Sequence, residues 1–387
     1  MRKFVQSLGI LLALVCFLCG IPSGAPQSAQ VFAGFAVEEA DFEIEETNIA
    51  TEEADFAEVE PEGEVAAAGN FGRGQDARTV FLGGMPLTLC LKNRGLVILG
   101  KIDVITKFGL ASTVKNSDIR VGDALLSVEG VDVNTSEELS EVINREEFAG
   151  RVLHVTLRRK GNTVETTLEP ALDLSTEKYK AGLLVREDTF GIGTLTYLTE
   201  DLRFGSLGHA VFDPDADSVM EIAGGNVYNC KISDVVKGER GRPGELRGGM
   251  VRTDGVIGSI DTNNKYGVYG TLKEKLLNPL FPEPVEVCPQ KSVKPGKAQI
   301  LTTLEGSEPE LYEIEIVKCC GQKQPNDRSM VIKVTDKKLI ERAGGIVQGM
   351  SGSPIVQNGK FVGAVTHVFI NDPLRGYGLY ADWMLLN

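Results

Sequence analysis

A short glycine-rich turn near the end of the chain places a serine where it could act as a nucleophile. The stretch from Gly344 to Ile355 contains Gly349-x-Ser351-Gly352. A serine hydroxyl needs a tight turn, a nearby base and backbone N–H groups that stabilise an oxyanion before it attacks an acyl carbon. Ser351 would be that nucleophile, and the N–H groups of Gly349 and Ser351 the oxyanion hole. The alternative is a turn without chemistry, because small residues collect in turns for conformational reasons.

The residues after this serine predict two strands joined by a tight turn. Asn358-Gly359 is a strong hairpin signal, and the apolar run 361–370 follows it. The same strand–turn–strand order follows the serine in chymotrypsin-like enzymes. We expect the second strand to form the wall along which an extended substrate lies, and the residues assigned to this wall are Gly363, Ala364, Val365 and Thr366.

A serine nucleophile needs a base, and the chain has only three histidines. His154 falls on the polar face of an alternating strand, which predicts a surface residue. His367 follows the serine and would line a pocket or simply pack. His209 lies at a glycine-bounded corner well before the serine, so it is the best candidate for the general base.

Composition indicates a mostly β protein with more than one domain. The chain has 387 residues, of which 42% are apolar and 24% charged, so it can bury two or three cores. Short runs of Val, Ile, Leu and Thr alternate with many of the 44 glycines. This pattern favours an all-β-rich architecture. The resemblances described below imply its parts, which are an N-terminal signal or anchor segment, a PDZ domain and a chymotrypsin-like double β-barrel.

The first 79 residues predict targeting and a spacer. Arg2 and Lys3 precede an uncharged stretch from Phe4 to about Ile21, so residues 1–26 are expected to be a signal peptide or a membrane anchor. Residues 27–79 are expected to be a disordered acidic linker, because 37–64 carries thirteen acidic residues and no Lys or Arg. An autoinhibitory or partner-binding role for this acidic stretch is the alternative. The rest of the chain is near neutral, and no nucleic-acid binding is expected.

Residues 80–172 predict a separable module. The strand around Val121-Gly122-Asp123 is followed by a helix with Thr135 as N-cap and Glu138 three residues later, which is a capping box. Two alternating strands then flank a turn at 160–162. This order resembles a PDZ domain of the bacterial protease type, which binds an extended peptide or a C-terminus by adding a strand. In place of the usual Ala-Gly-Ile before the core stands Asn-Ser-Asp-Ile at 116–119, and a plain β-rich spacer is the alternative.

No cofactor is expected. The seven cysteines show neither a disulfide framework nor a spacing to histidine that would bind a metal, so buried thiols are the default.

Four motifs together resemble the SpoIVB peptidase family, the stage IV sporulation protein B of endospore-forming bacteria. They are Phe-Gly-Ser-Leu-Gly-His at 204–209, Thr-Asp at 335–336, Gly-Gly-Ile-Val-Gln-Gly-Met-Ser-Gly-Ser-Pro at 344–354, and the stretch 363–373. By this resemblance, residues 177–387 form a serine peptidase domain and the catalytic residues are Ser351, His209 and Asp336. Asp336 lies only fifteen residues before Ser351, unlike the long separation in chymotrypsin. Asp213 is therefore the second candidate.

The resemblance also implies a role. A member of this family would be a serine endopeptidase that crosses the forespore membrane and works in the intermembrane space, anchored or released. It would cleave a regulator of an intramembrane protease complex, trigger pro-sigma-K processing and cleave itself. Its partners would be the protein substrate in that membrane complex, a peptide ligand of the PDZ domain and other copies of itself. The alternatives are an HtrA-like envelope quality-control protease and a non-catalytic PDZ scaffold.

Overall fold

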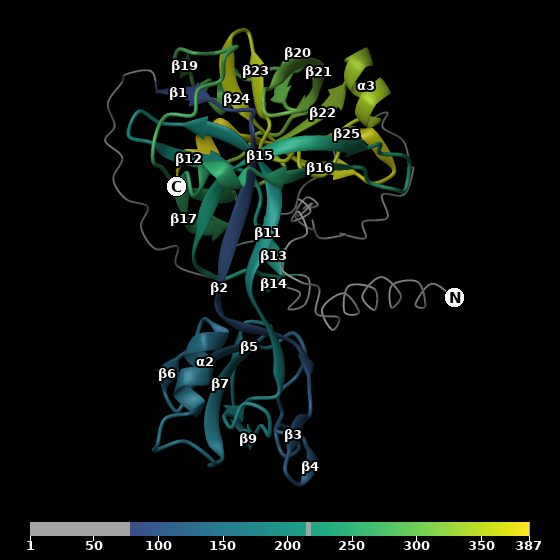
Figure 1. Ribbon diagram of the computed structural model, residues 1–387. Helices are drawn as coiled ribbons and strands as arrows, with labels where there is room; N and C mark the ends of the chain where they lie inside the picture. Colours follow the sequence, from purple (N-terminus) through teal and green to yellow (C-terminus); the bar gives the residue numbers. More distant parts are fainter. Residues whose placement is uncertain (1–77, 214–217, 387) are drawn as a thin grey trace. The chain divides into compact units, whose positions relative to one another are not determined.

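The computed structural model of the protein describes residues 78–213 and 218–386 (Figure 1). The expected leader at 1–26 and nearly all of the acidic linker at 27–79 lie outside these residues. None of the helices in the described part is long and apolar enough to cross a membrane. Strands dominate this part, which confirms the predicted mostly β fold class.

Six strands close into a first barrel. Their path is β11-β12-β18-β17-β15-β2, and pairing of β2 with β11 closes the ring. Alternate residues of β2, Leu87, Leu89 and Leu91, are fully buried in the core of this barrel, as the period of two in a strand requires. The strands are β2 (Pro86–Lys101), β11 (Leu183–Leu198), β12 (Arg203–Ser206), β15 (Ile222–Val236), β17 (Gly258–Asn264) and β18 (Gly267–Leu272).

A second closed barrel follows in the chain, in the order β20-β21-β22-β25-β24-β23. In β21 the alternate residues Tyr312, Ile314 and Ile316 are buried in its core. Two short helices, α3 (Lys337–Ala343) and α4 (Ala381–Met384), follow β22 and β25. The strands are β20 (Gly296–Thr302), β21 (Glu310–Cys319), β22 (Met330–Val334), β23 (Pro354–Gln357), β24 (Lys360–Phe369) and β25 (Asp372–Tyr380). The two barrels confirm the predicted double-barrel architecture.

Smaller elements complete the barrels. β1 pairs with β11 and β19, β16 pairs with β15, and β13 pairs with β14. These elements and the two 3₁₀ turns are β1 (Thr79–Leu82), β13 (Phe212–Asp213), β14 (Ser218–Val219), β16 (Glu245–Met250), β19 (Val285–Glu286), η1 (Arg252–Asp254) and η2 (Gln290–Ser292).

A separate core forms the PDZ-like module, which we define as residues 95–186. The predicted capping box is present: Glu138 N–H donates to Thr135 Oγ1 at 3.1 Å, and Thr135 N–H donates to Glu138 Oε2 at 3.2 Å. The apolar face of the helix, Leu139, Val142 and Ile143, is buried as expected. The elements are β3 (Val104–Thr106), β4 (Gly109–Ala111), β5 (Ala124–Val128), β6 (Val131–Asp132), α2 (Ser136–Ile143), β7 (Leu153–Arg159), β8 (Asn162–Leu168), β9 (Ala171–Leu172) and β10 (Tyr179–Lys180).

The PDZ-like module is inserted into the first barrel instead of preceding it. The first half of β2 pairs with β11 and β15 in the barrel, whereas its second half pairs with β5 of the module. Likewise β11 begins in the module, with Leu183 opposite Lys101, and ends in the barrel, with Thr194 opposite Pro86. The predicted module boundary at residue 80 therefore differs from the structure: β1 at 79–82 and the first half of β2 at 86–93 pair with barrel strands. Their sequence is as apolar as the strands of the module, so the pattern alone did not separate them.

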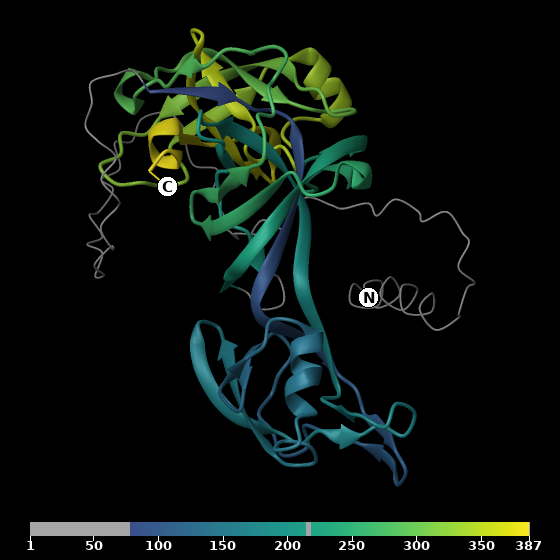
Figure 2. The same ribbon diagram turned by 60° about the vertical axis from the view of Figure 1, so that its left-hand side comes forward.

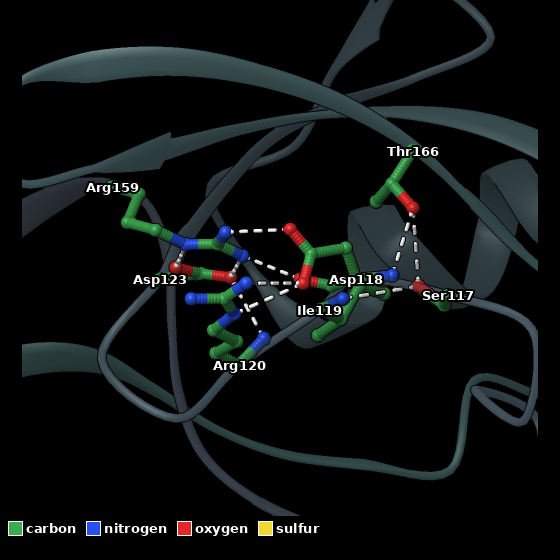
Figure 3. A network of polar contacts seen from close by, with 7 residues as sticks. All are labelled: Ser117, Asp118, Ile119, Arg120, Asp123, Arg159 and Thr166. Atoms are coloured by element: carbon green, nitrogen blue, oxygen red, sulfur yellow. Dashed lines mark hydrogen bonds and ion pairs between the residues drawn. The ribbon is translucent and has the colours of Figure 1, made fainter.

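An arginine fixes the turn before the core strand of the module, where the usual Ala-Gly-Ile is missing (Figure 3). Arg159 donates to both carboxylate oxygens of buried Asp123 at 2.8 Å and to Asp118 Oδ2 at 2.7 Å. Arg120 N–H also donates to Asp123, at 2.8 Å. Ion pairing with Arg159 and Arg120 lowers the pKa of Asp118 below its ordinary value. In this chain, which has Asn-Ser-Asp-Ile at 116–119, a network of charged side chains therefore holds the turn in place of the usual small residues.

Candidate active site

The turn that carries Ser351 adopts backbone conformations that glycine favours. Gly349 has φ of 94° and Gly352 has φ of 92°, both in the left-handed region. A Cβ at Gly352 would lie 2.4 Å from the Thr194 carbonyl oxygen and 2.5 Å from the Leu207 nitrogen. The glycines therefore let the serine turn of the second barrel lie directly on strands of the first.

Two threonines of β11 hold the carbonyl groups of this turn. Thr194 donates from its N–H to the Ser351 carbonyl at 3.1 Å and from Oγ1 to the Gly349 carbonyl at 2.8 Å. Thr196 Oγ1 donates to the Gly352 carbonyl at 2.7 Å. Both threonines are buried, and buried hydroxyls are normally hydrogen-bonded. In the sequence, the only hint was two threonines in the second half of β11, which has no charged residue, and this hint did not identify their partners.

The two amides predicted to form the oxyanion hole are available. Around them, the N–H groups of Gln348, Met350, Gly352 and Ser353 all donate to backbone carbonyls. Within the described residues, the N–H groups of Gly349 and Ser351 have no acceptor. Preorganised N–H groups of this kind stabilise the negative charge that develops on a carbonyl oxygen.

His209 stands at a strained corner beside the serine turn. Leu207 and Gly208 before it have φ of 71° and 75°, and a non-glycine residue in this region is uncommon and costs energy. A Cβ at Gly208 would lie 2.9 Å from Thr366 Cγ2. The Ser351 hydroxyl donates to the carbonyl of the same Thr366 at 2.8 Å. Thr366 of β24 thus brings the predicted base and the predicted nucleophile to one place.

The hydrogen bonds of His209 assign its tautomer. Nδ1 lies 2.7 Å from the Ala210 carbonyl oxygen. A carbonyl only accepts, so Nδ1 carries the proton and Nε2 carries the lone pair. Nε2 is buried and has no hydrogen-bond partner among the described residues. A neutral imidazole with a free Nε2 is the form that accepts a proton from a serine hydroxyl.

Burial controls the charge of this histidine. Loss of hydration lowers the pKa of His209 below its ordinary 6.5, while the bond to Ala210 and the field of Asp327 oppose that shift. The ring of His367 lies 5.0 Å from the ring of His209, centroid to centroid. Burial, His209 and Arg328 together lower the pKa of His367 to about 3, so His367 is neutral beside the base.

Comparison with known protein families gives two matches. Residues 177–385 match the SpoIVB peptidase S55 family, and residues 99–169 match the PDZ domain family. The first match spans more than half of the chain. The protein belongs to the SpoIVB peptidase S55 family. It is a serine peptidase that carries a PDZ domain, as the sequence motifs predicted.

Solved structures give only a distant likeness to this S55 peptidase. The crystal structure of Rv3671c protease in its inactive form shares 17% identity, covers 50% of this chain and 81% of that chain, and has a TM-score of 0.29. The active form of Rv3671c protease from M. tuberculosis also shares 17% identity, covers 51% and 72%, and has a TM-score of 0.27. No curated protein matches the chain.

Asp336, the predicted third catalytic residue, has a structural role in this S55 peptidase. It is the N-cap of α3: Oδ1 accepts from Lys338 N–H at 2.8 Å and from Leu339 N–H at 3.1 Å. Oδ2 accepts from Glu313 N–H at 3.2 Å. No hydrogen bond between described residues joins Asp336 to His209. In this structure the Ala210 carbonyl, and not Asp336, fixes the tautomer of His209. A catalytic role for Asp336 stays a prediction.

Asp213, the second candidate, is buried but engaged elsewhere. Its Oδ1 lies 2.6 Å from Arg186 Nη2, an ion pair that joins the end of β13 to the last residue of the PDZ-like module, on β11. An arginine that satisfies a buried carboxylate in this way makes the pair structural.

Most of the predicted substrate wall lies within the paired part of β24, and its contact with a substrate stays a prediction. Gly363 and Ala364 pair with Ile355 and Pro354 of β23 on one side and with Tyr380 and Leu379 of β25 on the other. Val365 exchanges hydrogen bonds with the serine turn itself. Only Thr366 of the predicted set lies past these pairings, and 367–369 beyond it are half-buried.

The other two histidines have the expected environments. His154 lies exposed on β7 of the PDZ domain, as its place on the polar face predicted. His367 packs beside the base, which was one of the two readings of the sequence. Elimination among three histidines therefore led to His209, which lies beside the serine turn.

Proposed function

We propose that this serine peptidase is an endopeptidase of intercompartmental signalling during sporulation. It cleaves a regulator of an intramembrane protease complex, and this cleavage triggers pro-sigma-K processing. It also cleaves itself. The observation that supports peptidase chemistry at this site is that the Ser351 turn, with its two free amides, and the corner that carries His209 both lie against Thr366. Membership of the S55 family supports the signalling role.

The geometry suggests the order of events. The Ser351 hydroxyl turns from the Thr366 carbonyl toward Nε2 of His209, which takes its proton as Oγ attacks the scissile carbonyl carbon. The resulting oxyanion accepts hydrogen bonds from the N–H groups of Gly349 and Ser351. His209 then gives the proton to the leaving amine, and water removes the acyl group by the same path in reverse.

The PDZ domain supplies a second contact for a protein substrate or partner. The first residues of β11, Leu183 to Arg186, pair on one edge with β2, and α2 lies nearby because Ser136 N–H donates to Glu187 Oε1 at 2.9 Å. An extended peptide or C-terminus adds to such a strand beside a helix. The target would belong to a membrane-associated complex, with the chain exported to the intermembrane space. Self-association through this domain is part of the same proposal.

Replacing the nucleophile tests both levels of the proposal. Ser351→Ala should abolish labelling by a fluorophosphonate and lower turnover by several orders of magnitude, because the nucleophile is lost while the fold remains. In sporulating cells the same variant should leave pro-sigma-K unprocessed and the chain itself uncut.

Ser353→Ala is the matched control, since Ser353 is fully buried two residues away. It should label and process normally. The unmodified enzyme could label at Ser351 and be active while Ser351→Ala cells still process pro-sigma-K normally. The protein would then be a peptidase with another role, such as envelope quality control. Normal turnover of substrate by purified Ser351→Ala would contradict the active site itself.

A further inference from the structure

Six exposed apolar side chains gather on one part of the PDZ domain. Phe108 is 89% exposed, Leu110 72%, Ile105 and Leu174 60%, Ile102 56% and Leu172 42%. They lie on the β3–β4 hairpin and on the neighbouring β9 segment, and we name them the hairpin patch. In Figures 1 and 2 the hairpin projects from the rest of the domain. Single exposed apolar residues are ordinary, but a contiguous group marks an interaction site.

The hairpin that carries the patch is held in place by its own hydrogen bonds. Ile105 pairs with Leu110 across the strands. Thr106 Oγ1 donates to the Gly109 carbonyl at 2.8 Å and accepts from Phe108 N–H at 3.1 Å. Leu174 N–H donates to the Ile105 carbonyl at 2.8 Å, which joins the second part of the patch to the first. The apolar side chains are therefore presented by an ordered structure.

The charges next to the hairpin along the chain are mainly positive, whereas 169–180 around β9 carries three acidic residues and two lysines. Residues 101–115 contain Lys101, Lys107 and Lys115 against a single acidic residue, Asp103, although the whole chain has a formal charge of −14. Lys107 Nζ lies 4.9 Å from the centroid of the Phe108 ring at the tip. A lysine beside an exposed aromatic ring can hold its charge at a polar surface while its stem and the ring lie in an apolar layer.

We propose that the hairpin patch inserts into the surface of a membrane that contains anionic lipids. A projecting tip needs no pocket in a fluid lipid layer, whereas a protein partner would have to provide one. The patch has no Trp, Tyr or Arg, the residues that dominate protein interfaces, and consists of a Phe and aliphatic residues. The lysines complement anionic headgroups. This contact is separate from the peptide-binding edge of β11.

Fluorescence from the tip of the hairpin tests the proposal on the full chain. Phe108→Trp places a reporter there, and the unmodified chain, with Trp383 alone, gives the background. The protein is reconstituted with vesicles of phosphatidylglycerol and phosphatidylcholine in equal amounts, some with acyl chains that carry bromine. We expect a blue shift and bromine quenching several-fold stronger than for Val317→Trp, an exposed apolar position on β21. Vesicles of phosphatidylcholine alone should quench less.

A second change separates the patch from the reporter. Leu110→Asp, added to Phe108→Trp, should return quenching to the level of Val317→Trp, and fluorophosphonate labelling of Ser351 should stay unchanged as evidence of the fold. Quenching that persists would show that the new Trp alone enters the lipid, and this would overturn the proposal. Equal quenching at positions 108 and 317 would overturn it too. So would a blue shift without vesicles that grows with protein concentration, because the patch would then bind a second copy.

Discussion

The two barrels differ in how their strands follow one another along the chain. The second barrel is built from one uninterrupted stretch, β20 to β25, and it carries Ser351. The first barrel is interrupted between β2 and β11 by the whole PDZ domain, and it carries His209. The nucleophile thus comes from a barrel built by one continuous segment, and the base from a barrel whose strands are separated by an inserted domain. One strand connects the two regions: β11 begins in the PDZ domain, and its Thr194 and Thr196 hold the serine turn.

Two deletions would break or support this comparison most strongly. Deleting residues 80–172 removes most of β1 and the barrel half of β2, with the fully buried Leu87, Leu89 and Leu91. Each such leucine is worth about 2–5 kcal/mol, against a total stability of about 5–15 kcal/mol for a domain. We expect this protein not to fold and not to label with a fluorophosphonate.

The matched deletion replaces residues 96–185 with a short Asn-Gly turn, which keeps the barrel strands and the ion pair of Arg186 with Asp213. It should fold by circular dichroism and react with a fluorophosphonate at Ser351, but cleave a protein target poorly, because binding energy from the PDZ domain is lost. A folded product that does not label would show that the PDZ domain is required for the active site.

The next largest effect concerns the base in the first barrel. His209→Ala removes the buried imidazole with its free Nε2, and we expect the second-order labelling rate to fall by about 10²–10⁴. His154→Ala, on exposed β7, is the control and should label at the normal rate. Normal labelling of His209→Ala would transfer the role of base to His367.

The same contrast between the barrels explains which parts of the fold and the site could be predicted from the sequence. In the second barrel the serine turn, the hairpin and the strand after it are contiguous, so local patterns were enough to propose Ser351 and its amides as site residues. In the first barrel the PDZ domain separates β2 from β11 along the chain. Local sequence patterns therefore could not predict that these two strands pair. The orientation of His209 by Ala210 and the support from Thr194 were missed for this reason. Asp336 was assigned from a motif whose carboxylate the structure uses to cap a helix.

The pH profile gives a smaller effect with a defined sign. Only the neutral form of His209 accepts a proton, and burial lowers its pKa below 6.5. The imidazole therefore stays neutral as the pH falls through 6.5, and the labelling rate should be lost only at lower pH, about tenfold per unit below the shifted pKa. Labelling rates across the acid range measure this. A half-maximal rate at or above pH 6.5 would mean that His209 is more hydrated than its burial indicates.

The smallest expected effect distinguishes a cap from a catalytic carboxylate. Asp336 accepts three backbone N–H bonds at the start of α3, and asparagine caps helices nearly as well as aspartate. Asp336→Asn should therefore change the labelling rate of Ser351 by only a few-fold, and Asp336→Ala should lower the free energy of unfolding by about 1 kcal/mol. A catalytic carboxylate that holds the histidine tautomer would behave differently, since its change to asparagine costs about 10⁴ in turnover. Measuring the labelling rate and urea unfolding of both variants separates the two. A loss of several orders of magnitude in Asp336→Asn, with normal stability, would show that Asp336 reaches His209 during catalysis and that the capped position is only its resting state.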